Sequence, residues 1–232
     1  NQINAFNNVG WKATLFMIGQ YVDDNRQEDA WITDAPKLRT LLGQGWAIGN
    51  HTWTHFCTEG ASNSEYLSEI NQGYARLMDV VNTSPRTDYK VNAFAAPCFI
   101  SDYNQVILNQ RNAAASSVKF VETGGNPFML VDSMNASSTY SNGSGSAVGI
   151  DFNSTIGRDV DMQSSGSAGI AKINWAAANS NSSRHIWFNS LSHGSSESAL
   201  TAVINHTYNN YGPNGNNTVW VAPSEQIYAY LL

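Results

Sequence analysis

Short apolar segments alternate with amphipathic segments along most of the 232 residues, and this alternation limits the possible folds most strongly. The apolar segments are predicted strands, at 13–18, 45–50, 91–97, 117–122, 184–193 and 218–223. The amphipathic segments carry apolar residues at helical spacing. They are predicted helices, at 34–45, 63–81, 102–113, 196–212 and 224–232. Strands that alternate with helices in this way favour an α/β fold with a parallel sheet or barrel.

One region interrupts the alternation. Residues 132–169 are rich in Ser, Gly and Asn, which predicts long loops or an irregular insertion. No internal repeat or linker divides the chain, so 1–232 is predicted to be one domain. Asp34 is predicted to cap the helix that follows it.

The composition excludes several classes of partner. Charged residues make up only 13% of the chain, about half the usual share. The net charge is −6 and no Lys/Arg cluster occurs, which argues against a nucleic-acid or anionic-membrane partner. No apolar run approaches the roughly 20 residues of a membrane span. Asn, Ser, Gly and Thr supply the polarity instead, which favours a protein that is secreted or held at the cell surface.

Polar features follow three of the predicted strands. His51 and His55 follow the strand at 45–50, Pro97 closes the strand at 91–97, and His193 follows "IWFNSLS". Parallel α/β folds bind ligands at the carboxyl ends of their strands. If a helical turn begins at His51, the two histidines lie on one face and hold a divalent ion such as zinc. The alternative is two polar residues on an exposed turn.

These motifs resemble those of the polysaccharide deacetylase family, the NodB-homology domains of carbohydrate esterase family four. "KATLFMIG" followed by "GWAIGNHTWTH" is similar to the family's second strand and its histidine motif. "FAAP" matches the position of its Arg-x-Pro motif, and "LSH" that of its Leu-x-His motif. The tail "VWVAPSEQIYAYL" resembles its last strand and helix, so the resemblance covers nearly the whole chain.

The resemblance implies a distorted (β/α) barrel and a metal-dependent hydrolase. Its substrate would be an acetylated extracellular polysaccharide of the chitin, peptidoglycan or poly-N-acetylglucosamine type. The cofactor would be a divalent metal, with zinc first and cobalt, nickel or manganese as alternatives. By match of position, His51 and His55 would be metal ligands, His193 the general acid, and the backbone N–H of Cys98 the oxyanion donor. A monomer is expected.

Four residues are expected at the substrate. By the same resemblance, Leu191 would line the pocket for the acetyl methyl group, and Trp175 is the candidate that completes it. Pro97 precedes the oxyanion donor, and Arg158 is placed in the substrate cleft. The alternative for Arg158, and for Asp159 and Asp161 beside it, is a solvated loop charge.

The sequence also departs from the family pattern. The family's Asp-Asp motif, which supplies a metal ligand and the base, lies on a strand that has no counterpart before residues 1–11. We therefore expect the first strand to be absent from this chain, and activity to require residues upstream of Asn1. Asp23 and Asp24 follow the second strand and are not given those roles. Ala95 stands where the family often has Arg.

Cys57 and Cys98 belong to the same rim if the barrel interpretation is correct. They are then predicted to form a disulfide that bridges two active-site loops, with two separate thiols as the alternative.

Two further functions remain open for the whole chain. One is a catalytically degenerate glycan-binding or structural extracellular protein, and the other is a xylan O-acetyl esterase.

Overall fold

Five parallel strands form the main sheet of the computed structural model, which describes residues 2–23, 33–112, 118–135, 137–143, 145–150, 155–158, 166–192 and 197–232. The spatial order of the strands is β1-β4-β5-β6-β10. Their bounds are β1 (Thr14–Met17), β4 (Ala47–Asn50), β5 (Ala93–Ala95), β6 (Phe120–Gly124) and β10 (Thr155–Arg158). The parallel α/β prediction is thus correct for this half of the molecule.

A second, mixed sheet lies beside the first, in the order β11-β7-β9-β8. Its strands are β7 (Phe128–Leu130), β8 (Thr139–Asn142), β9 (Gly145–Gly149) and β11 (Ile186–Phe188). A small parallel pair joins β2 (Val22–Asp23) to β3 (Thr33–Asp34). In the described residues β1 pairs only with β4, and β11 only with β7, so the ring of strands is open between β1 and β11.

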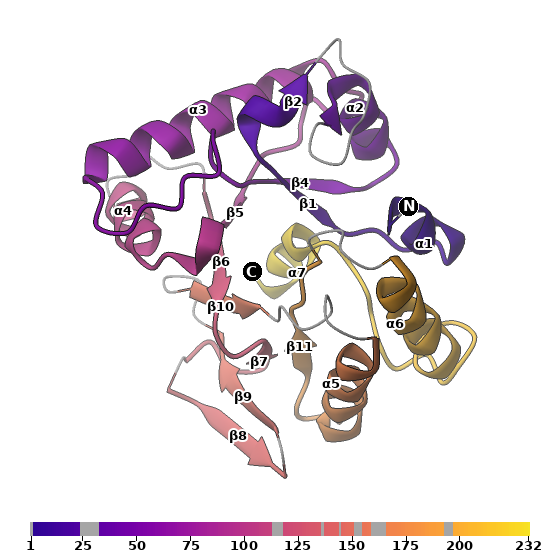
Figure 1. Ribbon diagram of the computed structural model, residues 1–232. Coiled ribbons are helices and arrows are strands. Elements are labelled where there is room, and N and C mark those ends of the chain that lie inside the picture. The colour runs from indigo at the N-terminus through magenta and orange to yellow at the C-terminus, as the bar shows by residue number, and fades with distance from the viewer. Residues whose placement is uncertain are drawn as a thin grey trace.

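Helices lie around the parallel sheet, whereas β8 and β9 extend beyond the helices at the bottom of Figure 1. The helices are α1 (Gln2–Asn8), α2 (Ala35–Gly43), α3 (Asn63–Asn82), α4 (Asp102–Asn112), α5 (Gly166–Asn179), α6 (Glu197–Asn210) and α7 (Ser224–Leu231), with short 3-10 turns η1 (Gly19–Tyr21) and η2 (Pro97–Phe99). A capping box between Ser62 and Glu65 starts α3. Asp34 occupies the N-cap position of α2, but its side chain makes no capping hydrogen bond. No helix among the described residues is long and apolar enough to cross a membrane.

Three sequence predictions need correction. The region 132–169 holds the β8–β9 hairpin and β10, so it is more regular than expected, because short side chains still permit backbone pairing. The segment 218–223 forms no strand, although it was predicted as the last one. The strand in 184–193 is limited to β11 and runs antiparallel to β7, because it belongs to the second sheet.

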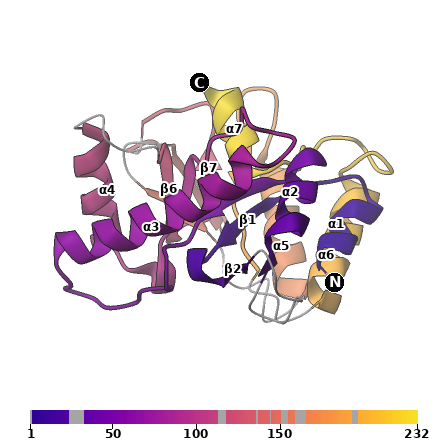
Figure 2. The same ribbon diagram turned by 90° about the horizontal axis from the view of Figure 1, so that it is seen from above.

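Helix α7 closes one end of the ring of strands, near the middle of Figure 1 and at the edge of Figure 2. Ile227 packs in one buried cluster with Ala93 and Phe120, the first residues of β5 and β6. The carboxyl ends of the parallel strands therefore face away from α7, and the segments that follow β4 and β5 lie at that opposite end.

Glu225, at the start of α7, holds its carboxyl group between two neighbouring side chains. The Thr14 hydroxyl donates to Oε2 at 2.7 Å, and the Tyr89 hydroxyl lies 3.0 Å from Oε1. Burial raises the pKa of Glu225 from 4.5 to about 7, and these hydrogen bonds offset only part of that effect. The folded chain therefore keeps a proton on Glu225 at pH values where the unfolded chain has released it.

The free energy of unfolding is expected to fall as pH rises from 4.5 to 7, because the unfolded state binds fewer protons in that window. This penalty is absent below the unfolded pKa and complete above the folded one, and it amounts to roughly 3 kcal/mol. Glu225→Gln keeps the shape of the side chain without a titrating proton, so it should flatten this part of the profile. Urea unfolding of both proteins across the window measures it, and equal slopes would contradict the assignment.

Candidate metal centre and the groove beside it

The segment after β4 carries both predicted ligands, but it does not form the expected helical turn. Thr52 and His55 have positive φ angles of 68° and 63°. The Thr52 hydroxyl oxygen accepts the backbone N–H groups of His55 at 3.0 Å and of Phe56 at 3.3 Å. The i, i+4 pair is therefore brought together by a polar loop with two left-handed residues.

Asn50 and Glu69 hold this loop in place, and neither role was predicted from the sequence. The Asn50 amide donates to the carbonyl of Ile70 at 2.9 Å and accepts the N–H of Thr52 at 3.0 Å. The Glu69 carboxylate accepts the N–H groups of Trp53 at 3.1 Å and Thr54 at 2.8 Å. A polar Asn at the end of an apolar strand was the available signal for the first role. The second depends on α3, which is distant in sequence.

The two imidazoles lie edge to face, with ring centroids 4.8 Å apart. His51 is buried, and its Nδ1 is 2.7 Å from the carbonyl oxygen of Ala95. A carbonyl only accepts, so Nδ1 of the neutral ring carries the proton and Nε2 carries the lone pair that a metal needs. Burial lowers the pKa of the half-buried His55, which keeps that ring neutral as well. Both side chains therefore fit a divalent metal.

Among the described residues, no group of three possible metal ligands combines His51 and His55 with a carboxylate. The one group of three possible ligands there consists of His55, Cys57 and Cys98, whose ligand atoms lie within 4.8 Å of one another. The histidine pair would therefore supply two of the three ligands that a catalytic zinc usually takes from protein.

The predicted disulfide is confirmed: Cys57 and Cys98 are bonded, with their Cα atoms 5.7 Å apart. It ties the segment after β4 to η2, which follows β5. Cys98 and Phe99 both have positive φ angles, of 49° and 57°. Non-glycine residues in this region tend to occur where a functional site fixes the backbone. The disulfide thus links two left-handed segments beside the histidines.

A groove of about 1640 Å³ opens between β1 and β11, and His51, Leu191 and Arg158 line it together. Arg158 is 6% exposed. Its guanidinium donates to the carbonyl of Ala96 at 2.9 Å and lies over the ring of Phe99, 5.0 Å from its centroid. Pro97 is the buried first residue of η2. The structure therefore brings two of the four predicted substrate residues, Leu191 and Arg158, into the groove that His51 also lines, and it places Pro97 directly after β5.

Glu122 also lines the groove, and the sequence analysis did not identify it. This residue of β6 is 2% exposed. Burial raises the pKa of Glu122, and the charge of Arg158 acts in the opposite direction. Glu122 Oε1 and Arg158 Nε are buried without a hydrogen-bond partner. An apolar-looking strand segment gave no sign of such a buried pair.

Trp175 is not brought to this rim. Its ring packs against Phe128 with centroids 4.6 Å apart, and its N–H donates to the carbonyl of Asn142 at 2.9 Å. These contacts belong to α5 and the second sheet, because Trp175 faces the β8–β9 hairpin that the sequence analysis did not anticipate. His193, Asp24, Asp159 and Asp161 lie outside the described residues.

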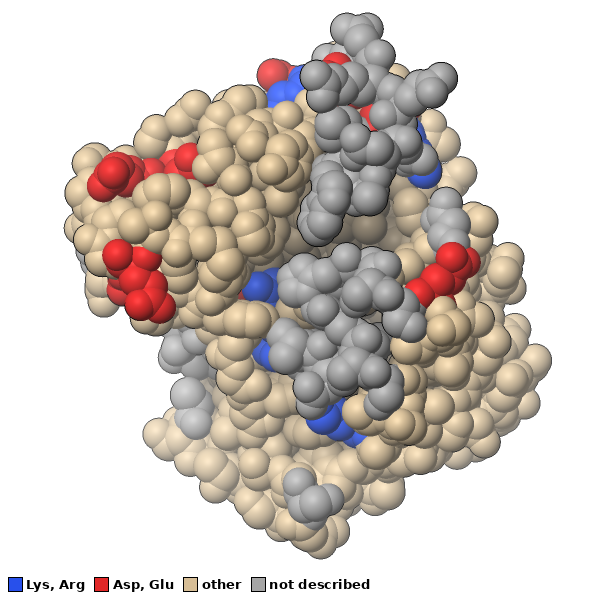
Figure 3. Space-filling model, in the orientation of Figure 1, with Lys and Arg blue, Asp and Glu red and all other residues tan. Residues whose placement is uncertain are grey.

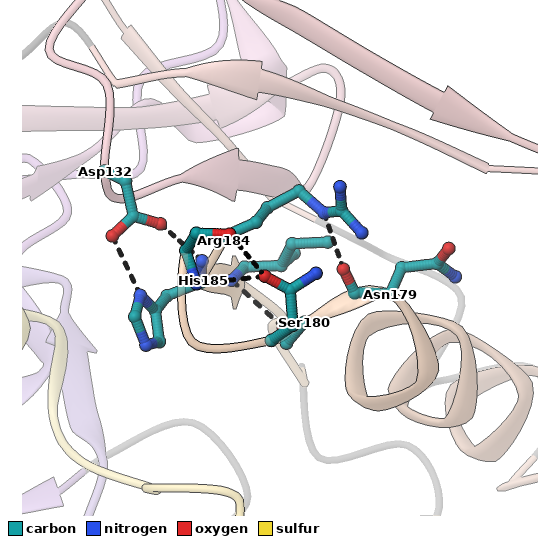
Figure 4. A network of polar contacts seen from close by, with 8 residues as sticks. Asp132, Asn179, Ser180, Arg184 and His185 are labelled. Carbon is teal, nitrogen blue, oxygen red and sulfur yellow. Dashed lines mark hydrogen bonds and ion pairs between the residues drawn. The ribbon is translucent and has the colours of Figure 1, made fainter.

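A second polar cluster stands elsewhere along the groove (Figure 4). Nδ1 of His185 is 2.8 Å from Asp132, and the backbone N–H of His185 donates to the same carboxylate. Although partial burial acts in the other direction, the hydrogen bonds from His185 hold the pKa of Asp132 below its usual value. Arg184 donates to the carbonyl of Asn179 at 2.7 Å, which ties β11 to α5.

Few charged side chains appear on the face shown in Figure 3, and its Lys and Arg side chains form separate spots. This agrees with the low charge content of the sequence. The described part of this face thus carries no continuous basic surface.

Comparisons with known proteins agree with the fold and the motifs. The family model "Polysaccharide deacetylase" matches residues 1–114. The structure of T48 deacetylase with substrate is 11% identical, with a TM-score of 0.53 over 99% of this chain and 83% of that chain. The Xyl-CE4 domain of a multidomain xylanase from the hindgut metagenome of Trinervitermes trinervoides is 15% identical, with a TM-score of 0.53 over 98% and 82%.

A family 4 acetyl xylan esterase from Clostridium thermocellum, in complex with a cobalt ion, aligns over a smaller part. It is 19% identical with a TM-score of 0.37 over 53% of this chain, and the chain spans about half, 49%, of its length. A comparison with curated protein sequences gives no match.

The family model that matches residues 1–114 describes polysaccharide deacetylases, and the α/β fold is shared with T48 deacetylase and with the Xyl-CE4 domain. Residues 1–114 match the model of the polysaccharide deacetylase family, so the resemblance seen in the sequence is confirmed over that part of the chain. The expected fold is confirmed as well, because two solved structures align over almost the whole chain.

Proposed function

We propose that this protein is a metal-dependent hydrolase that removes N-acetyl groups from an extracellular polysaccharide of the chitin, peptidoglycan or poly-N-acetylglucosamine type. One observation carries the proposal. His51 and His55 stand side by side at the end of β4, and the Ala95 carbonyl fixes the His51 ring in the form that binds a cation. The match to the polysaccharide deacetylase family supports it.

His51 and His55 would hold a divalent metal, and zinc is the first choice because two neutral imidazoles suit it. When bound, such an ion supplies Lewis-acid activation of water and of the acetyl carbonyl. The proposed third ligand and the base are carboxylates outside the described residues.

The remaining roles belong to the chain itself. The backbone N–H of Cys98, held by the disulfide and its left-handed conformation, would donate to the developing oxyanion. His193 would give a proton to the leaving amine. Leu191 would contact the acetyl methyl group in the groove beside His51, and Arg158 would orient polar groups of the substrate.

We further propose that the protein is secreted or held at the cell surface. A disulfide is stable in oxidising compartments, and a polysaccharide substrate of this kind is extracellular.

An O-acetyl esterase acting on xylan is the second candidate, favoured by the likeness to the Xyl-CE4 domain of a xylanase. Acetate release from N-acetylated chito-oligosaccharides and from acetylated xylan, measured side by side with the full-length protein and added zinc, separates the two. Faster release from the chito-oligosaccharides is expected. Faster release from xylan would favour the esterase. No release from these or from other N-acetylated glycans would favour a degenerate glycan-binding protein.

A further inference from the structure

The Cys57–Cys98 disulfide lies directly against one of the proposed metal ligands. Cys57 Sγ is 3.5 Å from Nδ1 of His55. The ligand atoms of His55, Cys57 and Cys98 all fall within 4.8 Å of one another. Disulfide sulfurs are poor metal ligands, so this group of three binds no metal strongly while the bond is intact.

The spacing nevertheless matches what a thiolate site requires. Zinc bonds of about 2.3 Å to sulfur and about 2.0–2.1 Å to nitrogen, at tetrahedral angles, place sulfur and nitrogen roughly 3.5 Å apart and two sulfurs roughly 3.8 Å apart. The contact between Cys57 and His55 already has this length, at 3.5 Å. With Cα atoms 5.7 Å apart, the two cysteines need only side-chain rotation to separate their sulfurs by that amount.

We propose that reduction of this disulfide creates a second metal site, for a soft divalent cation such as zinc, from the Cys57 and Cys98 thiolates and Nδ1 of His55. The reductant is a dithiol. It transfers two electrons and two protons to the disulfide and becomes a disulfide itself, which leaves two thiols on the chain. Metal binding then releases these two thiol protons, and water takes the fourth position.

The chemistry favours the thiolate site once it exists. Two thiolates bring two negative charges to the cation and are softer ligands than imidazole, so they prefer zinc and cobalt over magnesium or calcium. The disulfide is partly exposed, so a small dithiol reaches it. His55 belongs to both sites and His51 only to the first, which gives the two histidines different roles in the reduced protein.

Cobalt titration tests the proposal, because thiolate ligation of Co²⁺ gives a charge-transfer band in the near ultraviolet. The full chain is reduced with dithiothreitol, freed of it without oxygen, and titrated with Co²⁺ beside the oxidised chain. The reduced chain should show the band and saturate at one Co²⁺ per chain, whereas the oxidised chain should show none. Absence of the band in reduced, folded protein would overturn the proposal.

Matched histidine variants identify the third ligand. Asparagine is the substitute at both positions, because it tolerates the left-handed backbone that His55 adopts, with φ of 63°. In the reduced protein, His55→Asn should weaken Co²⁺ binding about tenfold or more, and His51→Asn should leave the thiolate band and its affinity unchanged. Equal effects of the two variants, or none from His55→Asn, would contradict the assignment.

The double variant Cys57→Ser/Cys98→Ser serves as the control for the effect of disulfide loss on folding, because it lacks both the crosslink and the thiols. Co²⁺ should raise the Tm of the reduced chain, or restore its fold if reduction has unfolded it, by clearly more than it stabilises the double variant, which keeps only the His51–His55 pair. A reduced chain that Co²⁺ neither stabilises nor refolds would count against the site. None of these readouts involves acetate release, so they are independent of the proposed function.

Discussion

His51→Asn is expected to abolish metal-dependent acetate release and to weaken zinc binding by the oxidised protein by more than about 100-fold. Changes to groups that merely orient a metal-bound histidine already cost about 10- to 100-fold in affinity, so loss of a ligand should cost more. His51 is buried and its ring is fixed by Ala95. No other side chain therefore moves easily into its place. Competition with a chromogenic chelator measures the zinc affinity.

His206→Asn is the matched control. His206 lies on α6, where its Nε2 contacts Asn174 at 2.7 Å, and it is not among the residues that line the groove with His51. This variant should bind zinc and release acetate as the unchanged protein does. A His51→Asn protein with normal zinc affinity would show that the metal binds elsewhere.

Gly73→Ala is expected to destabilise the fold and to disturb the histidine loop, although alanine is the better helix former. Gly73 lies in the middle of α3, where the loop packs closely against the helix. An added Cβ would stand 2.5 Å from Asn50 Oδ1 and 2.7 Å from the carbonyl carbon and oxygen of Thr52. Because the close contact is with the backbone carbonyl of Thr52 and not with a movable side chain, the loop has to shift. The net cost should be roughly 1–3 kcal/mol, against the gain of about 1 kcal/mol that helix propensity alone predicts.

Asn71→Ala, two residues earlier on an exposed position of α3, serves as the comparison. It should change the free energy of unfolding by less than about 0.5 kcal/mol. Denaturant unfolding measures the stability of both variants. Zinc affinity reports on the conformation of the loop, and this affinity should be lowered only in Gly73→Ala. If Gly73→Ala were as stable as Asn71→Ala and bound zinc normally, the close packing of the loop on α3 would be wrong.

The sequence predicted four of the five strands of the parallel sheet, because each of these four begins in an apolar run next to an amphipathic helix; β10 was missed because it lies in the region predicted to be irregular. β1, β4 and β5 lie within predicted strands, and β6 begins within one and extends two residues beyond it. The second sheet was missed for a physical reason. β8 and β9 are built largely from Ser, Gly, Thr and Asn, and they pair through their backbones without an apolar pattern that could mark them.

The candidate site was predictable only where a local motif carries it. The spacing of the two histidines in "HTWTH" indicated that His51 and His55 lie together, and the two cysteines indicated the Cys57–Cys98 disulfide. The left-handed backbone at Thr52 and His55 was not predictable, because it depends on Glu69 and Gly73 of α3. The charge of Arg158 acts on Glu122 because β10 pairs with β6, which the sequence did not indicate. Trp175 does not lie at the predicted acetyl pocket but packs against the second sheet. It had been assigned to the pocket without a motif, on a loose alignment through loops of uncertain length.

Acetate release before and after metal removal tests the central claim most directly. The full-length, oxidised protein is treated with a chelator, assayed on N-acetylated chito-oligosaccharides, and assayed again after stoichiometric zinc is restored. The proposed function predicts that release stops on chelation, returns with zinc, and does not return in His51→Asn. Release that continues without metal, or that zinc restores equally in the His51 variant, would contradict a metal-dependent site at His51 and His55.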